Sequence, residues 1–165
     1  MMLYLMRHGL AEEPTPKSDD GARKLTEKGA EKIRKAAAGM RATDLAFNMI
    51  LTSPIARAAE TAEIVAAELG GPKPRAVPEL STGASPTGAL EALIKLRLPE
   101  NVLVVGHEPT LSRLASLMLT GSSESVGIKF KQGGVIALEF PDRVERGAAQ
   151  LRSMMTQRQL RQLRK

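Results

Sequence analysis

Residues 50–71 read ILTSPIARAAETAEIVAAELGG, a short apolar run followed directly by a segment with a helical pattern. We predict Ser53 as the helix N-cap, Pro54 as the first helical residue and Gly70 as the stop, because these residue types favour those positions. The same order of apolar strand and capped helix returns along the chain. It predicts an α/β domain in which strands and helices alternate.

Further helices are marked by their ends. We expect them to begin at Thr26, at Ser85 with Pro86 and at Pro109, and a capping-box pattern at Thr156 and Gln159 predicts a last short one. Strands are predicted at Met2–Met6, Met49–Thr52, Val102–Val105 and Val135–Phe140, with shorter ones near Ala76–Val77 and at Ala149–Met154. Near-continuous apolar strands indicate a sheet covered on both faces. We therefore expect one domain over residues 1–165, a three-layer α/β/α sandwich with a mostly parallel, mixed sheet, in which residues 11–24 form a polar loop.

The composition restricts the class of protein. The chain has no cysteine, which excludes disulfides, a thiolate nucleophile and a cysteine-based metal site. No apolar run reaches the roughly 18 residues of a membrane span, and Arg7 and His8 come too early for the apolar core of a signal peptide. We expect a soluble, cytoplasmic protein with no membrane partner.

The net charge of +6 is concentrated near the C-terminus. Residues 1–140 carry 17 Lys and Arg against 16 Asp and Glu, and residues 141–165 carry seven against two. Aromatic side chains that could stack on bases are nearly absent. We interpret the excess as a solvated basic tail and expect no nucleic acid as a partner, with binding through the Arg-rich residues 152–165 as the alternative.

Both histidines of the chain and two arginines follow predicted strands. Arg7 and His8 come after the first strand, Arg57 lies in the first turn of the helix after the second, and His107 directly follows residues 102–106. The carboxyl ends of parallel strands meet at one edge of a sheet. We therefore expect these four side chains to form one cluster.

Such a cluster suits a phosphoryl group. Arginine presents a planar fork of donors that fits phosphate oxygens, and nearby helix N-termini add backbone donors. Neighbouring arginines lower the pKa of an imidazole and keep it neutral, so one histidine can attack phosphorus while the other donates to the phosphoryl oxygens. We expect Gly9 to leave room for the phosphoryl group to approach His8.

Taken singly, each of these residues has an ordinary structural interpretation. Arg7 and His8 could be a surface pair, His107 a hydrogen-bonded residue at a strand end, and Arg57 a partner of Glu60 on its own helix. A metal site is disfavoured, because arginines at both histidine positions repel a cation and HEPTL lacks the second histidine of an HExxH motif. Only the coincidence of all four supports a reactive site.

The segments LMRHGLAE, RKLTEKG, LTSPIARAAETAEIVA, PEL and VLVVGHEPTLS together resemble the histidine phosphatase (phosphoglycerate-mutase-like) superfamily. The resemblance runs from Met1 to about Phe140. Within the superfamily, the chain most resembles the short SixA-type phosphohistidine phosphatases, because the stretch between the SPxxR helix and GHEP is too short for the helical lid of larger members. It implies an α/β sandwich around a mostly parallel sheet with one antiparallel strand, and no metal or cofactor.

The resemblance also implies roles for the residues that match its motifs. His8 would be the phosphorylated nucleophile, Arg7 and Arg57 would bind the phosphoryl oxygens, and His107 would complete the pocket. Glu79 in PEL is the candidate general acid, with a structural carboxylate or a solvated loop residue as the alternative. Glu108 and an acid in the 11–20 loop stay open as other groups that assist proton transfer. A weak general acid favours phosphohistidine over a sugar or glycerate phosphate, because the leaving nitrogen can be protonated in advance.

The sequence thus predicts a phosphatase that hydrolyses phosphohistidine on a protein through a phospho-His8 intermediate, and we expect it to be a monomer. A general phosphomonoesterase that acts on a small phosphorylated metabolite is the alternative among enzymes. A non-catalytic phosphate- or phosphoprotein-binding module on the same fold is the alternative from another class. The intact set of two histidines and two arginines argues against that module.

Overall fold

The computed structural model describes residues 1–164, which contain a six-stranded sheet of order β3-β2-β4-β1-β5-β6. The strands are β1 (Met2–Arg7), β2 (Met49–Thr52), β3 (Arg75–Ala76), β4 (Asn101–Gly106), β5 (Val135–Glu139) and β6 (Gln150–Met155). The pairs β1–β4, β2–β4 and β2–β3 are parallel, whereas β5 is antiparallel to both β1 and β6. One reversed strand in a mostly parallel sheet confirms the mixed sheet that the sequence predicts.

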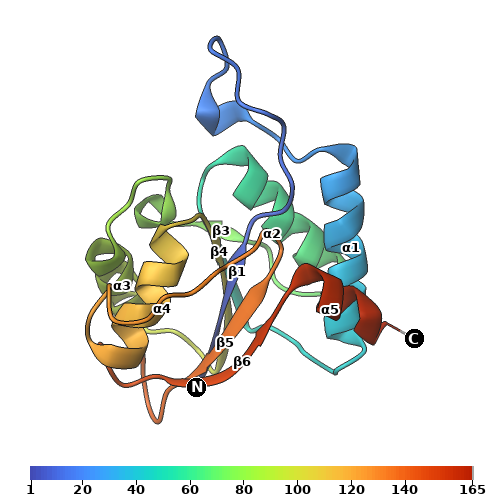
Figure 1. Ribbon diagram of the computed structural model, residues 1–165. Coiled ribbons are helices and arrows are strands. Elements are labelled where there is room, and N and C mark those ends of the chain that lie inside the picture. Colours follow the sequence, from blue (N-terminus) through green and yellow to red (C-terminus); the bar gives the residue numbers. More distant parts are fainter. Residues whose placement is uncertain (165) are drawn as a thin grey trace.

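Helices cover both faces of this sheet (Figure 1). They are α1 (Glu27–Arg41), α2 (Ala56–Leu69), α3 (Pro86–Lys95), α4 (Thr110–Thr120) and α5 (Gln157–Leu163), with short 3-10 helices η1 (Asp20–Ala22) and η2 (Pro78–Leu80). α1 packs against α2 and α5, and α3 packs against α4. The three-layer architecture is confirmed. Within residues 1–164, no helix is both long enough and apolar enough to cross a membrane.

The two faces of the sheet bury separate apolar cores. Leu3 and Leu5 of β1 lie in the core under α3 and α4, whereas Met6 lies in the core under α1 and α2. Successive side chains of a strand point to opposite faces, so a strand that is buried on both sides is apolar at nearly every position. This is why the continuous apolar run of β1 is a central strand with a helical layer on each side.

Most of the predicted helix ends are confirmed. The hydroxyls of Thr26 and Ser85 accept hydrogen bonds from the amides three residues later, and Thr156 and Gln159 form the full capping box. The prediction for α2 is wrong at its start, because this helix begins at Ala56 and its N-cap is Ile55. The hydroxyl of Ser53 accepts instead from the Ile55 N–H and contacts a histidine described below.

The C-terminal basic segment is folded onto the rest of the domain. β6 forms the edge of the sheet, and α5 packs along α1 with Leu160 buried between them. Arg152 on the exposed face of β6 pairs with Glu139 of β5. Residues 141–164 are therefore not a free tail: the predicted strand and short helix are both folded onto the domain, and most of the charged side chains of this segment are exposed, whereas the Nε atom of Arg161 is buried.

The contact between α1 and α5 depends on Gly39. A β-carbon at this position would overlap the backbone oxygen of Leu160. We expect Gly39→Ala to lower the free energy of unfolding by about 1–3 kcal/mol through overpacking, although alanine favours helix by about 1 kcal/mol. Urea denaturation measures the change, and Gly127→Ala is the matched control because the space around Gly127 is open. Equal midpoints for the two variants would contradict the expectation.

Candidate active site

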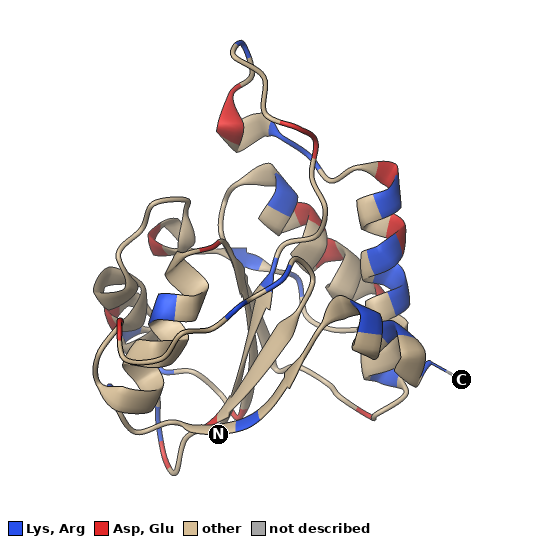
Figure 2. Cartoon of the chain, in the orientation of Figure 1, with Lys and Arg blue, Asp and Glu red and all other residues tan. Residues whose placement is uncertain are grey.

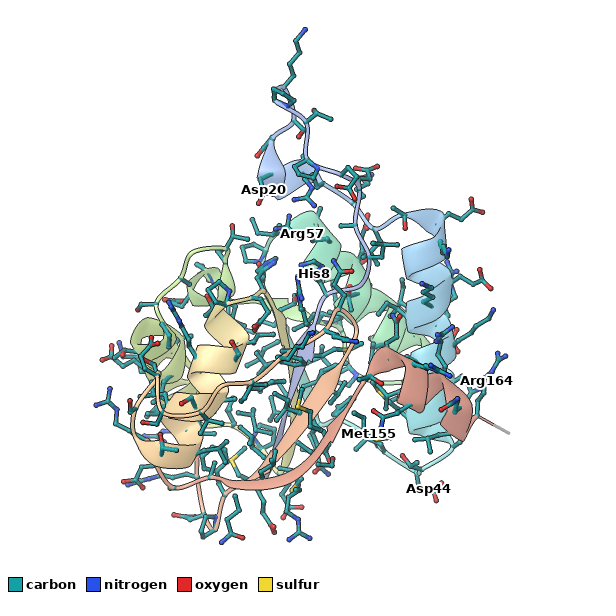
Figure 3. The ribbon with its side chains drawn as sticks, in the orientation of Figure 1. His8, Asp20, Asp44, Arg57, Met155 and Arg164 are labelled. Atoms are coloured by element: carbon teal, nitrogen blue, oxygen red, sulfur yellow. The ribbon has the colours of Figure 1, made fainter. Side chains whose placement is uncertain are left out.

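The parallel pairing of β1 and β4 brings the two histidines together. Arg7 lies opposite Gly106 in this register, so His8 and His107 leave adjacent strands at the same edge of the sheet. Their ring centroids are 5.2 Å apart, with 53° between the ring planes. Arg57, in the first turn of α2, reaches His8 from the next strand-to-helix junction (Figure 3). The structure thus places the four residues singled out from the sequence in one cluster.

The tautomer of His8 follows from its backbone contact. Its Nδ1 atom lies 2.7 Å from the carbonyl oxygen of Gly9, which can only accept a hydrogen bond. Nδ1 therefore carries the ring proton, and Nε2 presents a lone pair. The Nε–H of Arg57 points at this lone pair over 3.4 Å. Nε2 of His8 is thus a buried, unprotonated nitrogen at the centre of the cluster.

Both imidazoles are kept neutral, mainly by burial. His8 is 6 % exposed and His107 is 2 % exposed. The pKa of His8 is lowered to about 4: burial is the largest cause, the Gly9 hydrogen bond opposes it, and the charges of Arg57, Arg7 and Arg23 add to it. The pKa of His107 is lowered to about 3, mainly by burial, and the neighbouring His8 ring and the Arg57 charge also lower it. The sequence analysis attributed this effect to the arginines, but desolvation is the larger cause.

His107 is held from one side by Ser53. Its Nε2 atom lies 2.8 Å from the Ser53 Oγ, which is fully buried and also accepts from the Ile55 N–H. The Nδ1 atom of His107 is buried with no hydrogen-bond partner within residues 1–164. A serine hydroxyl that already accepts from an amide can still donate its own proton to Nε2. In the tautomer in which Ser53 donates to Nε2, His107 carries its proton on Nδ1.

The two arginines are anchored by backbone oxygens. Arg7 donates from Nη1 to the carbonyl of Phe130 at 2.9 Å, and its buried Nε has no partner among the described residues. Arg57 is 5 % exposed and donates from Nη1 to the carbonyl of Asp20 at 2.8 Å. Its suggested partner Glu60 instead accepts from the Leu25 N–H. Both guanidinium groups are therefore fixed in orientation, as a phosphate-binding group must be.

Asp20 and Arg23 also belong to the site, although the sequence analysis named neither of them and left open only an unspecified acid of the 11–20 loop. The Asp20 carboxylate accepts from Arg57 Nη2 at 3.1 Å and from Arg23 Nη1 at 2.7 Å. The hydrogen bond from Arg23, and then that from Arg57, keeps the pKa of Asp20 below its usual value. In the sequence they are an ordinary charged pair in a polar loop. Nothing in residues 11–24 indicates that η1 folds over Arg57.

Gly9 is required for a reason other than the one expected. A β-carbon at Gly9 would lie 2.7 Å from Cγ1 of Ile33 and 3.2 Å from Cδ2 of Leu25. The restriction therefore comes from packing between the end of β1 and α1, and not from the approach of a phosphoryl group. The Gly9 amide donates to Thr61 Oγ1, which in turn donates to the carbonyl of Arg57. Thr61, which the sequence analysis did not single out, thereby ties the His8 loop to α2.

The structure adds no support for Glu79 as a general acid. Glu79 lies exposed on η2, and it lines a cavity with Arg75 and Lys95 beside the edge strand β3. Neither His8 nor His107 lines that cavity. In the part of the chain that the structure describes, no three His, Asp or Glu side chains gather so that they could bind a metal ion.

Comparison with known proteins agrees with this fold. The model of the histidine phosphatase superfamily (branch 1) matches residues 3–81. An uncharacterized protein of Picosynechococcus is 36 % identical over 144 residues, which cover 84 % of each chain. The chain belongs to the histidine phosphatase superfamily.

Two solved structures share the fold over nearly their whole length. The protein histidine phosphatase SixA complexed with tungstate superposes with a TM-score of 0.84 at 24 % identity, covering 97 % of this chain and 99 % of that one. The α-ribazole phosphatase of Shigella flexneri superposes with a TM-score of 0.68 at 20 % identity, covering 95 % and 97 %. The phosphoglycerate-mutase-like fold predicted from the sequence is confirmed.

The buried histidines make the protein sensitive to acid. Below about pH 6.5 the unfolded chain binds protons on both imidazoles, whereas folded His107, with a pKa of about 3, stays neutral. The free energy of unfolding therefore falls as the pH drops from 6.5 towards 3, and His107 contributes about 2 kcal/mol of this loss between pH 7 and pH 5. Urea denaturation at both pH values should show a smaller loss for His107→Asn. Identical losses would contradict the neutral, buried state of His107.

Proposed function

We propose that this protein is a phosphatase that hydrolyses phosphohistidine on a protein substrate through a phosphorylated His8. The observation that carries the proposal is the unprotonated Nε2 of His8, buried beside the Arg57 guanidinium and facing a second neutral imidazole. A neutral nitrogen nucleophile needs no base to activate it. The surrounding cations offset the negative charge of the incoming phosphoryl group.

In the first step, Arg7 and Arg57 bind the phosphoryl oxygens and the Nδ1–H of His107 donates to one of them. The lone pair on Nε2 of His8 forms a bond to phosphorus as the bond from phosphorus to the substrate nitrogen breaks. The electron pair of that bond stays on the substrate imidazole, which leaves as a neutral ring because its other ring nitrogen was protonated beforehand. In the second step, water attacks phosphorus as the bond from phosphorus to Nε2 breaks. The electron pair of that bond returns to Nε2, and inorganic phosphate leaves with both protons of the water, as H2PO4⁻.

The bound phosphoryl group must share Arg57 with Asp20. Arg57 uses Nη1 and Nη2 for the carbonyl and carboxylate of Asp20, which leaves Nε directed at His8. The Asp20 carboxylate holds the guanidinium plane in place while it is itself held by Arg23. This arrangement orients the Nε–H of Arg57 towards the position that a phosphoryl oxygen takes beside Nε2.

The substrate class is argued from the leaving group. Within residues 1–164, Asp20 is the only carboxylate that forms an ion pair with Arg7 or Arg57, although Glu108 also acts on Arg7 through its charge. A paired carboxylate with a lowered pKa is a poor proton donor. Expulsion of an alkoxide needs such a donor, but expulsion of an imidazole whose other ring nitrogen is already protonated does not. The likeness in fold to the protein histidine phosphatase SixA, which binds the oxyanion tungstate, supports the same choice.

A general phosphomonoesterase acting on a small phosphorylated metabolite is the second candidate. It is favoured by the likeness in fold to an α-ribazole phosphatase. A phosphohistidine protein and a panel of sugar phosphates, assayed side by side for phosphate release, separate the two candidates. Comparable kcat/KM values for both kinds of substrate would reject the phosphohistidine assignment.

The nucleophile is tested with His8→Ala. We expect a loss of phosphate release of at least about 10³-fold, because the variant lacks the nitrogen that accepts the phosphoryl group in the proposed first step. Radiolabelled phosphohistidine protein should transfer label to the wild-type chain in rapid-quench samples, and to neither His8→Ala nor any buffer control. Lys73→Ala, an exposed change at the far edge of the sheet, is the matched control and should behave as wild type. Label retained by His8→Ala would place the nucleophile elsewhere.

The tautomer of His107 is tested with Ser53→Ala. Without the hydroxyl, Nε2 loses its donor, the proton is no longer confined to Nδ1, and kcat should fall by about 10- to 100-fold. Nitrogen-15 NMR of the ring should show Nδ1–H in the wild type and a shift towards Nε2–H in Ser53→Ala. A purely structural role of Ser53 would lower kcat without this change in ring shifts, and that result would contradict the assignment.

A further inference from the structure

A groove with basic residues adjoins the site on the side of α1 and α5. It is lined by Arg7, Leu10, Lys32, Lys131, Gln132 and Gln157, and has a volume of about 380 Å³. We call these six residues the basic groove. Arg7 belongs to the groove and to the proposed phosphoryl site, so the two adjoin each other at this residue. Figure 2 shows Lys and Arg positions along α1 and on the segment that leads into β5, the elements that form its walls.

The wall that carries Lys131 is fixed relative to His8. The Gly133 N–H donates to the carbonyls of Arg7 at 2.9 Å and His8 at 3.1 Å, and the Arg7 N–H donates to Gly134. Arg7 Nη1 also binds the carbonyl of Phe130. The turn from Phe130 to Gly134 is therefore attached to the end of β1. A group bound in the groove lies at a set position relative to the reacting nitrogen.

The charge of the groove is uncompensated. No Asp or Glu lines it, and in the described part of the chain neither Lys32 nor Lys131 forms an ion pair. Glu31, the residue before Lys32, pairs with Lys35 one turn further along α1 and forms no ion pair with Lys32. Two free ammonium groups beside Arg7 attract an anion, and Gln132 and Gln157 can add neutral donors.

We propose that the basic groove binds an acidic side chain of the phosphoprotein substrate, next to the phosphohistidine in the site. This inference rests on the proposed function. Lysines are flexible point charges that do not form the fork that arginine offers to phosphate, and Leu10 adds an apolar wall. A groove of this volume also exceeds the size of one phosphate group. A peptide segment with a carboxylate fits these features better than the second phosphate of a small molecule does.

The test uses two phosphohistidine peptides that differ only in Glu or Gln at positions flanking the phosphohistidine. We expect wild type to prefer the Glu peptide by about tenfold in kcat/KM, with the preference lost at about 0.5 M salt. Lys32→Glu with Lys131→Glu should reverse the preference, favouring a matched Lys peptide. Lys73→Glu with Lys95→Glu is the control, because it makes the same change of charge at exposed positions near the opposite edge strand β3 and should keep the preference for Glu.

Binding of the same peptides to His8→Ala separates this inference from the proposed function. If neither peptide is turned over but His8→Ala still binds the Glu peptide about tenfold more tightly, the groove is retained and the phosphatase is rejected. Equal turnover and equal affinity for both peptides would overturn the proposed binding of an acidic side chain in the groove and leave the phosphatase assignment intact. Competition by a small bisphosphate that depends on Lys32 and Lys131, without any peptide preference, would also overturn it.

Discussion

The site depends on the parallel pairing of β1 with β4. This register places Arg7 opposite Gly106, so that two histidines separated by 99 positions in numbering leave neighbouring strands at the same level. Both strands are covered on both faces, so the edge of the sheet is the place where their polar residues can meet a ligand. A shift of one residue in this pairing would direct the histidines to opposite faces of the sheet.

Burial in this position has a chemical consequence as well as an energetic cost. The rings of His8 and His107 are nearly inaccessible to water, so the protonated form is disfavoured before any neighbouring charge acts. The same desolvation reduces stability in acid and keeps a nitrogen lone pair available near neutral pH. Arg57 can be buried beside these rings because the carbonyl and carboxylate of Asp20 accept hydrogen bonds from two of its nitrogens, and the carboxylate offsets its positive charge. The loop of residues 11–24, which carries Asp20 and Arg23, thus contributes charged groups to the site.

Elements with local signals were predictable. Thr26, Ser85 and Thr156 cap helices as expected because each hydroxyl bonds an amide three residues away, which is a local interaction. Ser53 has the same local signal but does not cap α2, because its hydroxyl contacts His107, a residue 54 positions away. Gly9 shows the same limit, since it is needed for packing against Ile33 of α1. Errors occurred where a long-range contact replaced a local one.

The amino-acid sequence by itself determined the alternation of strands and helices, the class of sheet, and which histidines and arginines stand at strand ends, because these depend on periodicity and on local capping. Only the tertiary structure decided that Asp20 and Arg23 close over Arg57, that Ser53 holds His107, and that Lys32 and Lys131 share a groove beside Arg7. Each of these contacts joins segments far apart in the chain, and their charges alone do not indicate which of many possible partners they meet.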